Sequence, residues 1–331
     1  MDKSIRADQR DPIPYRLIKF MHEKVYSGLN AVKSRLHHVT KRILSQRRRN
    51  EVKQWLISMR KEWAPLYVLL HGRYTARELV GEIRARVKDD FDFLMVHSAN
   101  DRLLPMYSGK AQDIIQELMD FCGRNRTLVM PAFVLGGRSY DPCGYYRTHS
   151  FHVRKTPSEM GLLTEIFRRM PGVRRSLHPT HSVCAFGPLA EELTARHHLA
   201  STRTGKGTPF EIMAQKRTVI AGLGIEYYRC LTQMHTAEDL LGNDFPVGFQ
   251  KEHVPVTIVD SNEARLVYDL AVLKTTNSMN NSIVRALLSR IELQEWKYRG
   301  TALFMTYADK VTNRLIEAAA KGMTIWGCHN E

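Results

Sequence analysis

The stretch TARELVGEIRARVKDDFDFLMVH, residues 75–97, contains the change of pattern that decides the fold. Its first part places apolar residues at helical spacing and begins with Thr75 and Glu78 in capping-box spacing, which predicts a helix over 75–87. Its last part, 91–97, is a short apolar run typical of a buried strand. The fold therefore depends on whether this change from helix to strand is repeated along the chain.

The later segments alternate in the same way. Strands are predicted at 127–133, 182–187 and 218–224, a hairpin over 254–273 turning at Ser261–Asn262, and helices at 109–123, 157–170, 188–196, from 208, through 235–242, near 280–292 and at 304–321. Strand–helix alternation with a late hairpin predicts an α/β fold: a three-layer α/β/α domain with a central mixed sheet.

Two predicted helix starts share one pattern. TPSE at 156–159 and TPFE at 208–211 each place Thr at the N-cap, Pro at the first helical position and Glu two residues later. Such a start either serves the helix alone or also offers free backbone N–H groups to an anion. The sequence leaves both alternatives open.

The positive charge is unevenly distributed. The 331 residues carry a formal net charge of +15, of which residues 1–64, with 16 Lys+Arg and 6 Asp+Glu, hold +10. In this segment apolar residues recur every three or four positions between basic ones, which indicates a basic amphipathic helix. We therefore predict a basic helical N-terminal extension over 1–64 and a catalytic domain over 65–331. The domain carries the remaining net charge of +5.

The extension has three alternative roles. It could pack on the domain or on a second subunit in a homo-oligomer, lie on an anionic membrane surface, or contact nucleic acid. No aromatic interleaving or DNA-binding pattern accompanies the charge, so we expect no nucleic-acid partner.

Composition narrows the class of protein. There is no run of 18 apolar residues and no secretory leader at the N-terminus, and the five cysteines form no CxxC pair. These features predict a cytoplasmic protein without disulfides or a metal site, peripheral to the inner face of the membrane if the extension binds lipid.

The usual nucleotide-binding and hydrolase motifs are absent. Polar residues at the ends of predicted strands are the remaining candidates, because open α/β sheets bind ligands there. Three such clusters lie at 96–101, 174–182 and 232–238.

These clusters and the segments between them resemble the aminoglycoside 3-N-acetyltransferase, or antibiotic N-acetyltransferase, family. The matching segments, in family order, are VHSA (96–99), VMPAF (129–133), TPSEMGLLTEIFRRMPGVRRSLHPTHSVCAFGP (156–188), GKGTPF (205–210) and TQMHTAE (232–238). The resemblance covers roughly residues 75–325 and leaves out residues 1–74.

The resemblance implies transfer of an acetyl or short acyl group from acyl-CoA to an amine, with no metal. The histidine of the TQMHTAE segment, His235, would be the general base. A base with a pKa near 7 can take the proton of an amine during its attack on a thioester. Transfer would be direct, because no Cys or Ser lies in a clear nucleophile motif.

A base of this kind needs a carboxylate to orient it. The family supplies one from a downstream strand region, where this sequence has no Glu at the expected place and Asp269 is the nearest acid. Glu238, three residues after His235, is the alternative. We expect Asp269 to be the orienting residue.

The first two clusters resemble the coenzyme A side of the family site. By this resemblance His97, Ser98, Arg175, Ser176 and His178 would contact or shape the acetyl-CoA pocket, with Arg175 suited to a phosphate. Ala99 replaces the second serine of the family's VHSS pattern.

The acceptor is expected to bind the loop over 136–155, where Asp141, Tyr145 and Tyr146 are the candidate residues. Because the domain is net positive, the sequence favours an anionic acceptor, such as a nucleotide-linked amino sugar of polysaccharide biosynthesis. The alternatives are acetylation of aminoglycosides in antibiotic resistance, and a non-catalytic relative whose basic extension binds membrane or nucleic acid.

Overall fold

The computed structural model describes residues 63–87, 90–137, 140–274 and 279–328. The chain divides into two compact units between Gly72 and Arg73. The first unit contributes one described helix, α3 (Ala64–His71). Almost all of the predicted extension over 1–64 lies outside the described residues and stays a prediction.

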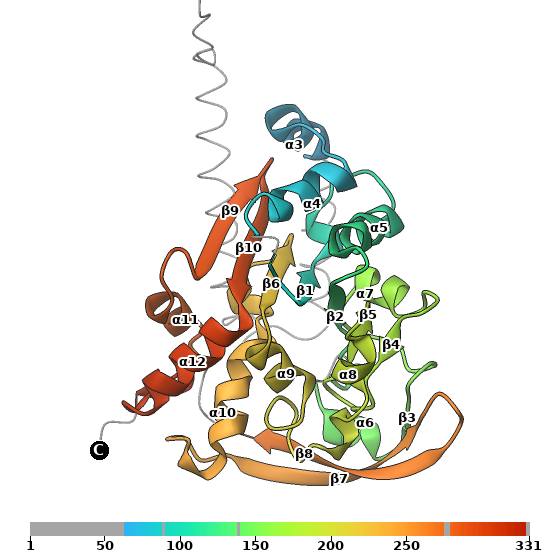
Figure 1. Cartoon of the computed structure of the whole chain (residues 1–331), viewed down its shortest axis with the longest axis vertical. Helices are drawn as coiled ribbons and strands as arrows, with labels where there is room; N and C mark the ends of the chain where they lie inside the picture. Colours follow the sequence, from blue (N-terminus) through green and yellow to red (C-terminus); the bar gives the residue numbers. More distant parts are fainter. Residues whose placement is uncertain (1–62, 88–89, 138–139, 275–278, 329–331) are drawn as a thin grey trace, which may run out of the picture. The chain divides into compact units, whose positions relative to one another are not determined.

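The second unit is built on a seven-stranded mixed sheet (Figure 1). The strand order is β4 (Arg174–Arg175), β5 (Val183–Phe186), β2 (Thr127–Pro131), β1 (Phe93–Ser98), β6 (Thr218–Leu223), β10 (Thr301–Tyr307) and β9 (Leu293–Tyr298). The central strands β2, β1 and β6 are parallel, and the outer pairs are antiparallel. This confirms the predicted mixed sheet.

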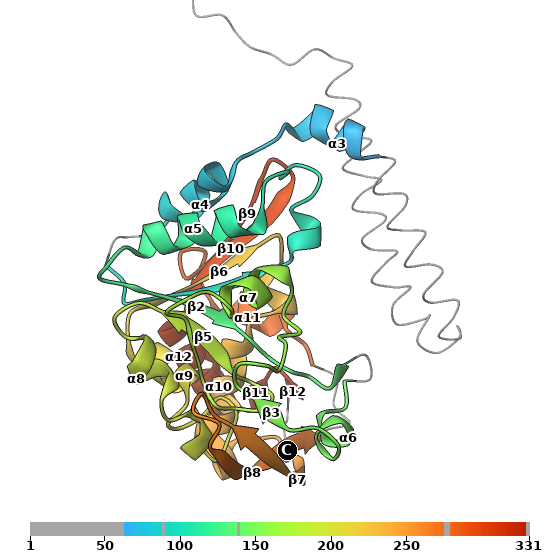
Figure 2. The same cartoon turned by 90° about the vertical axis from the view of Figure 1, so that its right-hand side faces the viewer.

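Helices cover both faces of the sheet (Figure 2). One layer contains α4 (Ala76–Arg84), α5 (Ala111–Cys122) and α7 (Leu162–Phe167); the other contains α8 (Ala190–Thr194), α9 (Pro209–Gln215), α10 (Thr236–Leu241) and α12 (Ala308–Ala319). Thr75 accepts a hydrogen bond from Glu78 N, and the Glu78 carboxylate accepts one from Thr75 N, so the predicted capping box is confirmed.

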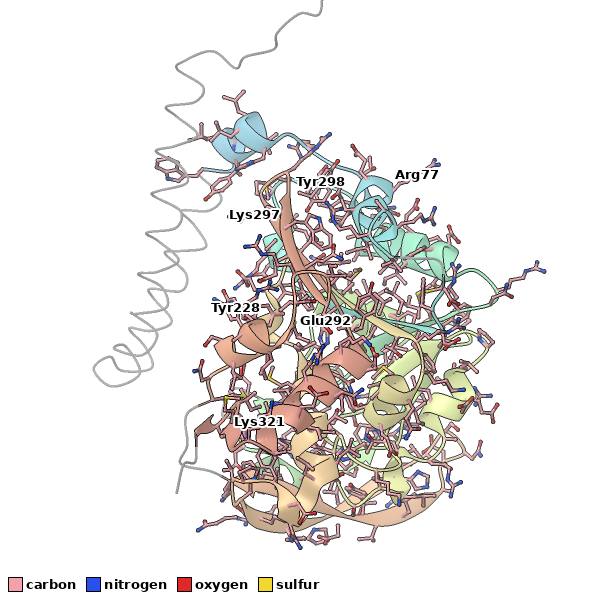
Figure 3. All side chains as sticks on the ribbon, turned by 60° about the vertical axis from the view of Figure 1, so that its left-hand side comes forward. Arg77, Tyr228, Glu292, Lys297, Tyr298 and Lys321 are labelled. Carbon is pink, nitrogen blue, oxygen red and sulfur yellow. The ribbon has the colours of Figure 1, made fainter. Side chains whose placement is uncertain are left out.

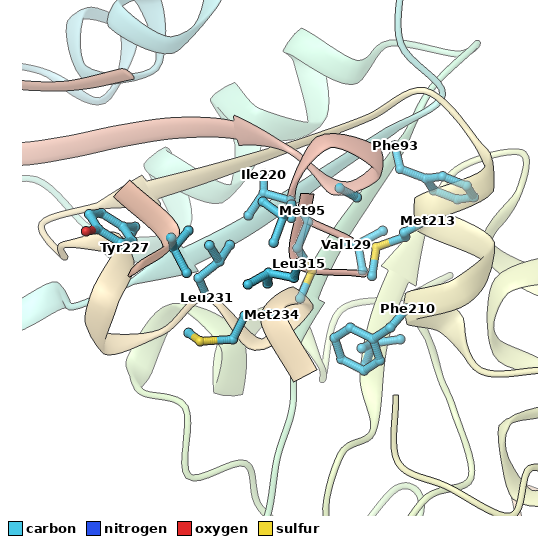
Figure 4. Packing of buried hydrophobic residues seen from close by; sticks show 14 of the residues in the cluster. Phe93, Met95, Val129, Phe210, Met213, Ile220, Tyr227, Leu231, Met234 and Leu315 are labelled. Carbon is cyan, nitrogen blue, oxygen red and sulfur yellow. The ribbon is translucent and has the colours of Figure 1, made fainter. Parts of the chain in front are cut away.

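Alternate residues of the central strands form a buried core with the second helical layer (Figure 4). Its members include Phe93, Met95, Val129 and Ile220 from the sheet, and Phe210, Met213, Met234 and Leu315 from the helices and the turn beside them. This packing fixes α9 and the chain around Met234 against one face of the sheet.

A second, three-stranded sheet lies below the first and consists of β3 (Phe151–His152), β7 (Gln250–Val259) and β8 (Arg265–Lys274). The predicted hairpin is confirmed. Its turn is held by Asp260, whose Oδ1 accepts hydrogen bonds from the amides of Asn262 and Ala264.

One of the two TPxE segments does not start a helix as predicted. The helix expected at 157–170 begins only at Leu162, because the side chains at 156–159 bond elsewhere: Thr156 Oγ1 accepts from His152 N, and the Glu159 carboxylate accepts from Leu135 N and Gly137 N. At 208–211 the same pattern does start a helix, with Thr208 accepting from Glu211 N.

The C-terminal helices are also shorter than predicted. α11 spans only Ser282–Leu287, and 293–307 forms the hairpin of β9 and β10. β10 pairs with β6 along five residues and buries Phe304 and Met305. The first residues of the helix predicted at 304–321 therefore form a strand, because pairing in the sheet outweighs their helical pattern. Two short strands, β11 (Met323–Thr324) and β12 (Gly327–Cys328), follow α12.

Candidate active site

His235 ends a short 3-10 helix, η5 (Thr232–His235), that follows β6 and leads directly into α10. Its Nδ1 lies 2.9 Å from Oε1 of Glu238, and its side chain is 15% exposed. An ionised carboxylate only accepts hydrogen bonds, so Nδ1 carries a proton, and in the neutral imidazole Nε2 is the nitrogen that keeps a lone pair. His235 therefore has the tautomer and the access that a general base needs.

Glu238 is almost completely buried and is the acceptor for two further donors. Arg203 Nη2 lies 2.5 Å from its Oε1, and Trp326 Nε1 lies 2.6 Å from its Oε2. Burial acts to raise the pKa of Glu238. The hydrogen bond and charge of His235, the charge of Arg203 and the hydrogen bond of Trp326 outweigh this effect and hold that pKa below its usual value. Glu238 is thus an anion at neutral pH.

Asp269, the carboxylate that the sequence favoured, is not brought to His235. It lies on β8 with its side chain 68% exposed, and its Oδ2 is 2.7 Å from Nδ1 of His253 on β7. The hairpin register places Asp269 opposite Pro255, on the outer part of the small sheet. Among the described residues, the carboxylate that bonds His235 is Glu238.

A cavity of about 230 Å³ adjoins this cluster. Its wall is formed by residues from the loop after β2, the loop before β5, the loop before α9 and β8: Leu135, Tyr140, Pro142, Thr180, His181, Arg203, Ala271, Val272 and Leu273. Burial lowers the pKa of His181 well below its ordinary value, and the charges of Arg203 and His235 lower it further. His181 is therefore neutral. Arg203 of the same wall bonds Glu238, the partner of His235, and so connects the cavity to this pair.

The loop before β5 is fixed by internal hydrogen bonds. Arg175 donates to the carbonyl oxygens of Ala132 and Thr156 and to Ser182 Oγ, and its guanidinium lies 4.8 Å from the ring centre of Phe151. These contacts occupy the donors that were expected to face a phosphate, so Arg175, at the end of β4, holds the loop before β5 in place.

Ser176 and His178 are also buried within this loop. Ser176 Oγ accepts from Val183 N and lies 2.9 Å from Nδ1 of His197. His178 Nδ1 accepts from the amides of Thr180 and His181, and burial holds its pKa well below its ordinary value. Both residues hold the loop whose Thr180 and His181 form part of the cavity wall.

His97 and Ser98 end β1, at the edge of the sheet where β6 also ends. His97 is 4% exposed, and burial lowers its pKa to about 4, so it is a neutral packing residue. Ser98 is partly exposed at the strand end.

The three acceptor candidates lie in and beside α6 (Pro142–Tyr146). Asp141 caps this helix by accepting from Gly144 N. Tyr146 is buried and donates to the carbonyl oxygen of Pro179, while Tyr145 stacks on His149 with ring centres 4.2 Å apart. The cavity wall includes their neighbours Tyr140 and Pro142.

Sequence reasoning missed Arg203 and Trp326. Arg203 stands just before the GKGTPF segment, so its nearness to that segment was the available signal. Trp326 lies in the turn between β11 and β12 and has no sequence pattern that links it to His235. Within the described residues, no group of three or more His, Cys, Asp or Glu side chains is arranged to hold a metal ion.

No helix in the described part of the chain has the length and apolar character needed to cross a membrane. At the start of α9, where the sequence left open whether the helix start also binds an anion, Glu211 Oε2 accepts a hydrogen bond from Gly207 N.

The chain matches the family model for aminoglycoside 3-N-acetyltransferase over residues 95–317. Aminoglycoside N(3)-acetyltransferase III of Acinetobacter baumannii is 32% identical over 154 residues, which are 42% of this chain and 51% of that protein. The chain thus spans about half the length of the curated relatives it matches.

Two solved structures share the fold. The room-temperature neutron/X-ray structure of sisomicin-bound AAC-VIa has a TM-score of 0.63 and 18% identity, covering 75% of this chain and 99% of that one. The binary complex of AAC-IIIb with CoASH has a TM-score of 0.62 and 21% identity, covering 78% and 99%. At these identities the likeness concerns the fold.

Proposed function

This chain belongs to the aminoglycoside 3-N-acetyltransferase family, and from that premise we propose that it is an acyl-CoA-dependent N-acyltransferase with His235 as general base. The observation that carries the proposal is the hydrogen bond of His235 Nδ1 to Oε1 of Glu238, whose other partner, Arg203, lines a cavity.

In the proposed reaction, the acceptor amine attacks the thioester carbonyl of the acyl-CoA, and His235 Nε2 takes the proton that the nitrogen loses. Glu238 stabilises the imidazolium that forms. The C–S bond then breaks, and the thiolate of coenzyme A leaves with the proton returned by His235. Glu238, whose bond to His235 is the one observed, takes the orienting role in this proposal in place of Asp269.

Direct transfer to the amine is supported by the state of the cysteines. Burial raises the pKa of four of the five cysteine thiols, Cys122, Cys143, Cys184 and Cys230. A buried thiol with a raised pKa is a poor nucleophile at neutral pH. A covalent acyl-cysteine at these four positions is therefore disfavoured, and both substrates are expected to bind together.

For the donor, we propose acetyl-CoA or another short acyl-CoA, in keeping with the CoASH complex of AAC-IIIb. Ser98, partly exposed at the end of β1, is the member of the predicted set that is free to contact it. His97, Arg175, Ser176 and His178 would act by holding the strand end and the loop before β5 in place.

For the acceptor, we propose an amine on an aminoglycoside-like sugar, because the matching relatives are named for that activity. One observation favours a second class. The nine residues of the cavity wall include no Asp or Glu, so the wall itself offers no carboxylate to a polycation. A nucleotide-linked amino sugar is the corresponding alternative.

The experiment is a thiol-release assay with acetyl-CoA over aminoglycosides and nucleotide-linked amino sugars. Turnover of either panel that is lost in His235→Gln supports the proposal. His253→Gln is the matched control, because His253 also pairs with a carboxylate but is 53% exposed. Full activity of His235→Gln would refute His235 as the base, and the panel that reacts identifies the acceptor.

A further inference from the structure

The carboxylate of Glu238 receives hydrogen bonds from three separate segments of the chain. His235 and Arg203 donate to Oε1, at 2.9 and 2.5 Å, and Trp326 donates to Oε2 at 2.6 Å. The two oxygens are therefore engaged from different directions. The carboxylate cannot rotate without breaking a charge-assisted hydrogen bond, and such bonds are among the strongest in proteins.

Trp326 comes from outside the part of the chain that the family model matches, which ends at residue 317. Its indole lies in the turn between β11 and β12, with its ring centre 6.2 Å from that of His235 and packed edge-on against Phe249 at 5.5 Å. The main-chain amide of Trp326 is also fixed, because it donates to Thr324 Oγ1. The indole is thus held in place independently of Glu238.

We infer that Trp326 is a positioning residue for His235. Its N–H fixes Oε2 of Glu238, so that Oε1 stays directed at His235 Nδ1 and the proton stays on that nitrogen. This inference rests on the proposed function of His235, and Trp326 acts through Glu238 without touching the reacting atoms. Without the indole N–H, Glu238 can turn, and the imidazole can exchange to the tautomer that blocks Nε2.

The test variant is Trp326→Phe, which keeps an aromatic ring and removes the donor. Trp296→Phe is the matched control, because Trp296 Nε1 also donates to a glutamate, Glu82 Oε2, at 3.1 Å. Trp296 lies on the edge strand β9, the strand that carries Lys297 and Tyr298 in Figure 3. We expect kcat to fall about tenfold in Trp326→Phe with KM for acetyl-CoA unchanged, and the control to stay within about twofold.

A readout without turnover separates this inference from the proposed function. In ¹⁵N spectra of the histidine rings, the resonances missing from His235→Gln identify His235. We expect Nδ1 to be protonated in the wild type and a mixture of tautomers in Trp326→Phe, with no change in Trp296→Phe. If no amine is acetylated by the wild type, the proposed function fails while these spectra still decide the role of Trp326.

A second variant keeps the inference testable if Trp326→Phe does not fold. Glu238→Gln should move the indole N–H proton resonance of Trp326 and leave that of Trp296 in place. An unmoved Trp326 resonance, or wild-type tautomer and kcat in a folded Trp326→Phe, would overturn the inference.

Discussion

His235 and Glu238 are joined by a 2.9 Å hydrogen bond, and helix α10 begins at Thr236, directly after His235. Because α10 packs on α12, the carboxylate is carried on a fixed helical turn and not on the exposed hairpin that holds Asp269. The geometry of the proposed base is thus set by a contact that is local in the sequence. The donors that fix the carboxylate come from distant segments.

Replacing Glu238 by Gln should lower kcat about 100-fold, because the amide stabilises an imidazolium far less than a carboxylate does. Asp269→Asn is the control and should keep wild-type kcat, since Asp269 bonds His253 at the surface. Steady-state kinetics with acetyl-CoA measure both. A large loss in Asp269→Asn with little loss in Glu238→Gln would return the orienting role to Asp269.

His235 and its orienting carboxylate also show how much of the site could be predicted from the sequence. The histidine was identified from its motif, and Glu238 was recognised as an alternative because it lies in the same motif. Choosing between Glu238 and Asp269 required the tertiary position of the β7–β8 hairpin, which no local pattern contains. Trp326 could not be predicted for the same reason.

The strands of the sheet were predictable where apolar runs are short and bounded by turns, as at 91–97 and 218–224. Prediction of helix starts from local capping patterns failed where a capping side chain forms hydrogen bonds with a distant part of the chain. TPFE at 208–211 caps a helix, but in TPSE at 156–159 the glutamate binds two amides of the loop after β2. Capping residues predict a helix start only when no distant amide competes for them.

Arg203 should control the pH dependence of the reaction. Its cation offsets the charge of Glu238 and lies 4.0 Å from Asp239. In Arg203→Gln the carboxylates are less compensated, so the imidazolium of His235 is stabilised and the acid limb of the kcat/KM profile should move to higher pH. Arg203→Lys should restore most of the wild-type profile.

The neighbouring charged groups are compensated. His181 is neutral because of its burial, and on α12, which packs on η5, Lys310 pairs with Asp309 and Arg314 pairs with Glu292 and Glu317. An acid limb that stays in place, or moves to lower pH, in Arg203→Gln would contradict the assigned charge balance.

Tyr146 should contribute to stability through its hydroxyl. It donates a 2.7 Å hydrogen bond to the Pro179 carbonyl inside the domain, so Tyr146→Phe leaves a buried acceptor unpaired and should cost about 1–3 kcal/mol of unfolding free energy. Tyr145→Phe is the matched control, because Tyr145 contacts His149 through its ring and should change stability by less than about 0.5 kcal/mol. Urea unfolding measures both; equal effects would contradict the role of the Tyr146 hydroxyl.

Glu165 should make the domain acid-sensitive. Burial acts to raise its pKa, but hydrogen bonds from Arg168, Ser158 N and Arg169 lower it from 4.5 to about 2. A folded-state pKa below the unfolded one gives stability that is present above pH 4.5 and is lost as the pH falls toward 2. Glu165→Gln should therefore be less stable than the wild type at pH 7, with the difference shrinking toward pH 2. A difference that is constant with pH would show that the charge of Glu165 is not involved.

Gly222 should not tolerate a side chain, because it lies on β6 directly opposite Phe304 of β10 and an added Cβ would overlap the Phe304 ring. Phe304 is 1% exposed, so the added methyl group must displace a buried ring, and Gly222→Ala should lower the unfolding free energy by about 1–3 kcal/mol. Gly81→Ala in α4 is the matched control: nothing lies within 4 Å of its added Cβ, and alanine in a helix interior should stabilise by about 0.5–1 kcal/mol. Opposite signs in urea unfolding are the expected result. A neutral or stabilising Gly222→Ala would mean that the β6–β10 pairing, and with it the seven-stranded sheet beneath His235, is not packed as described.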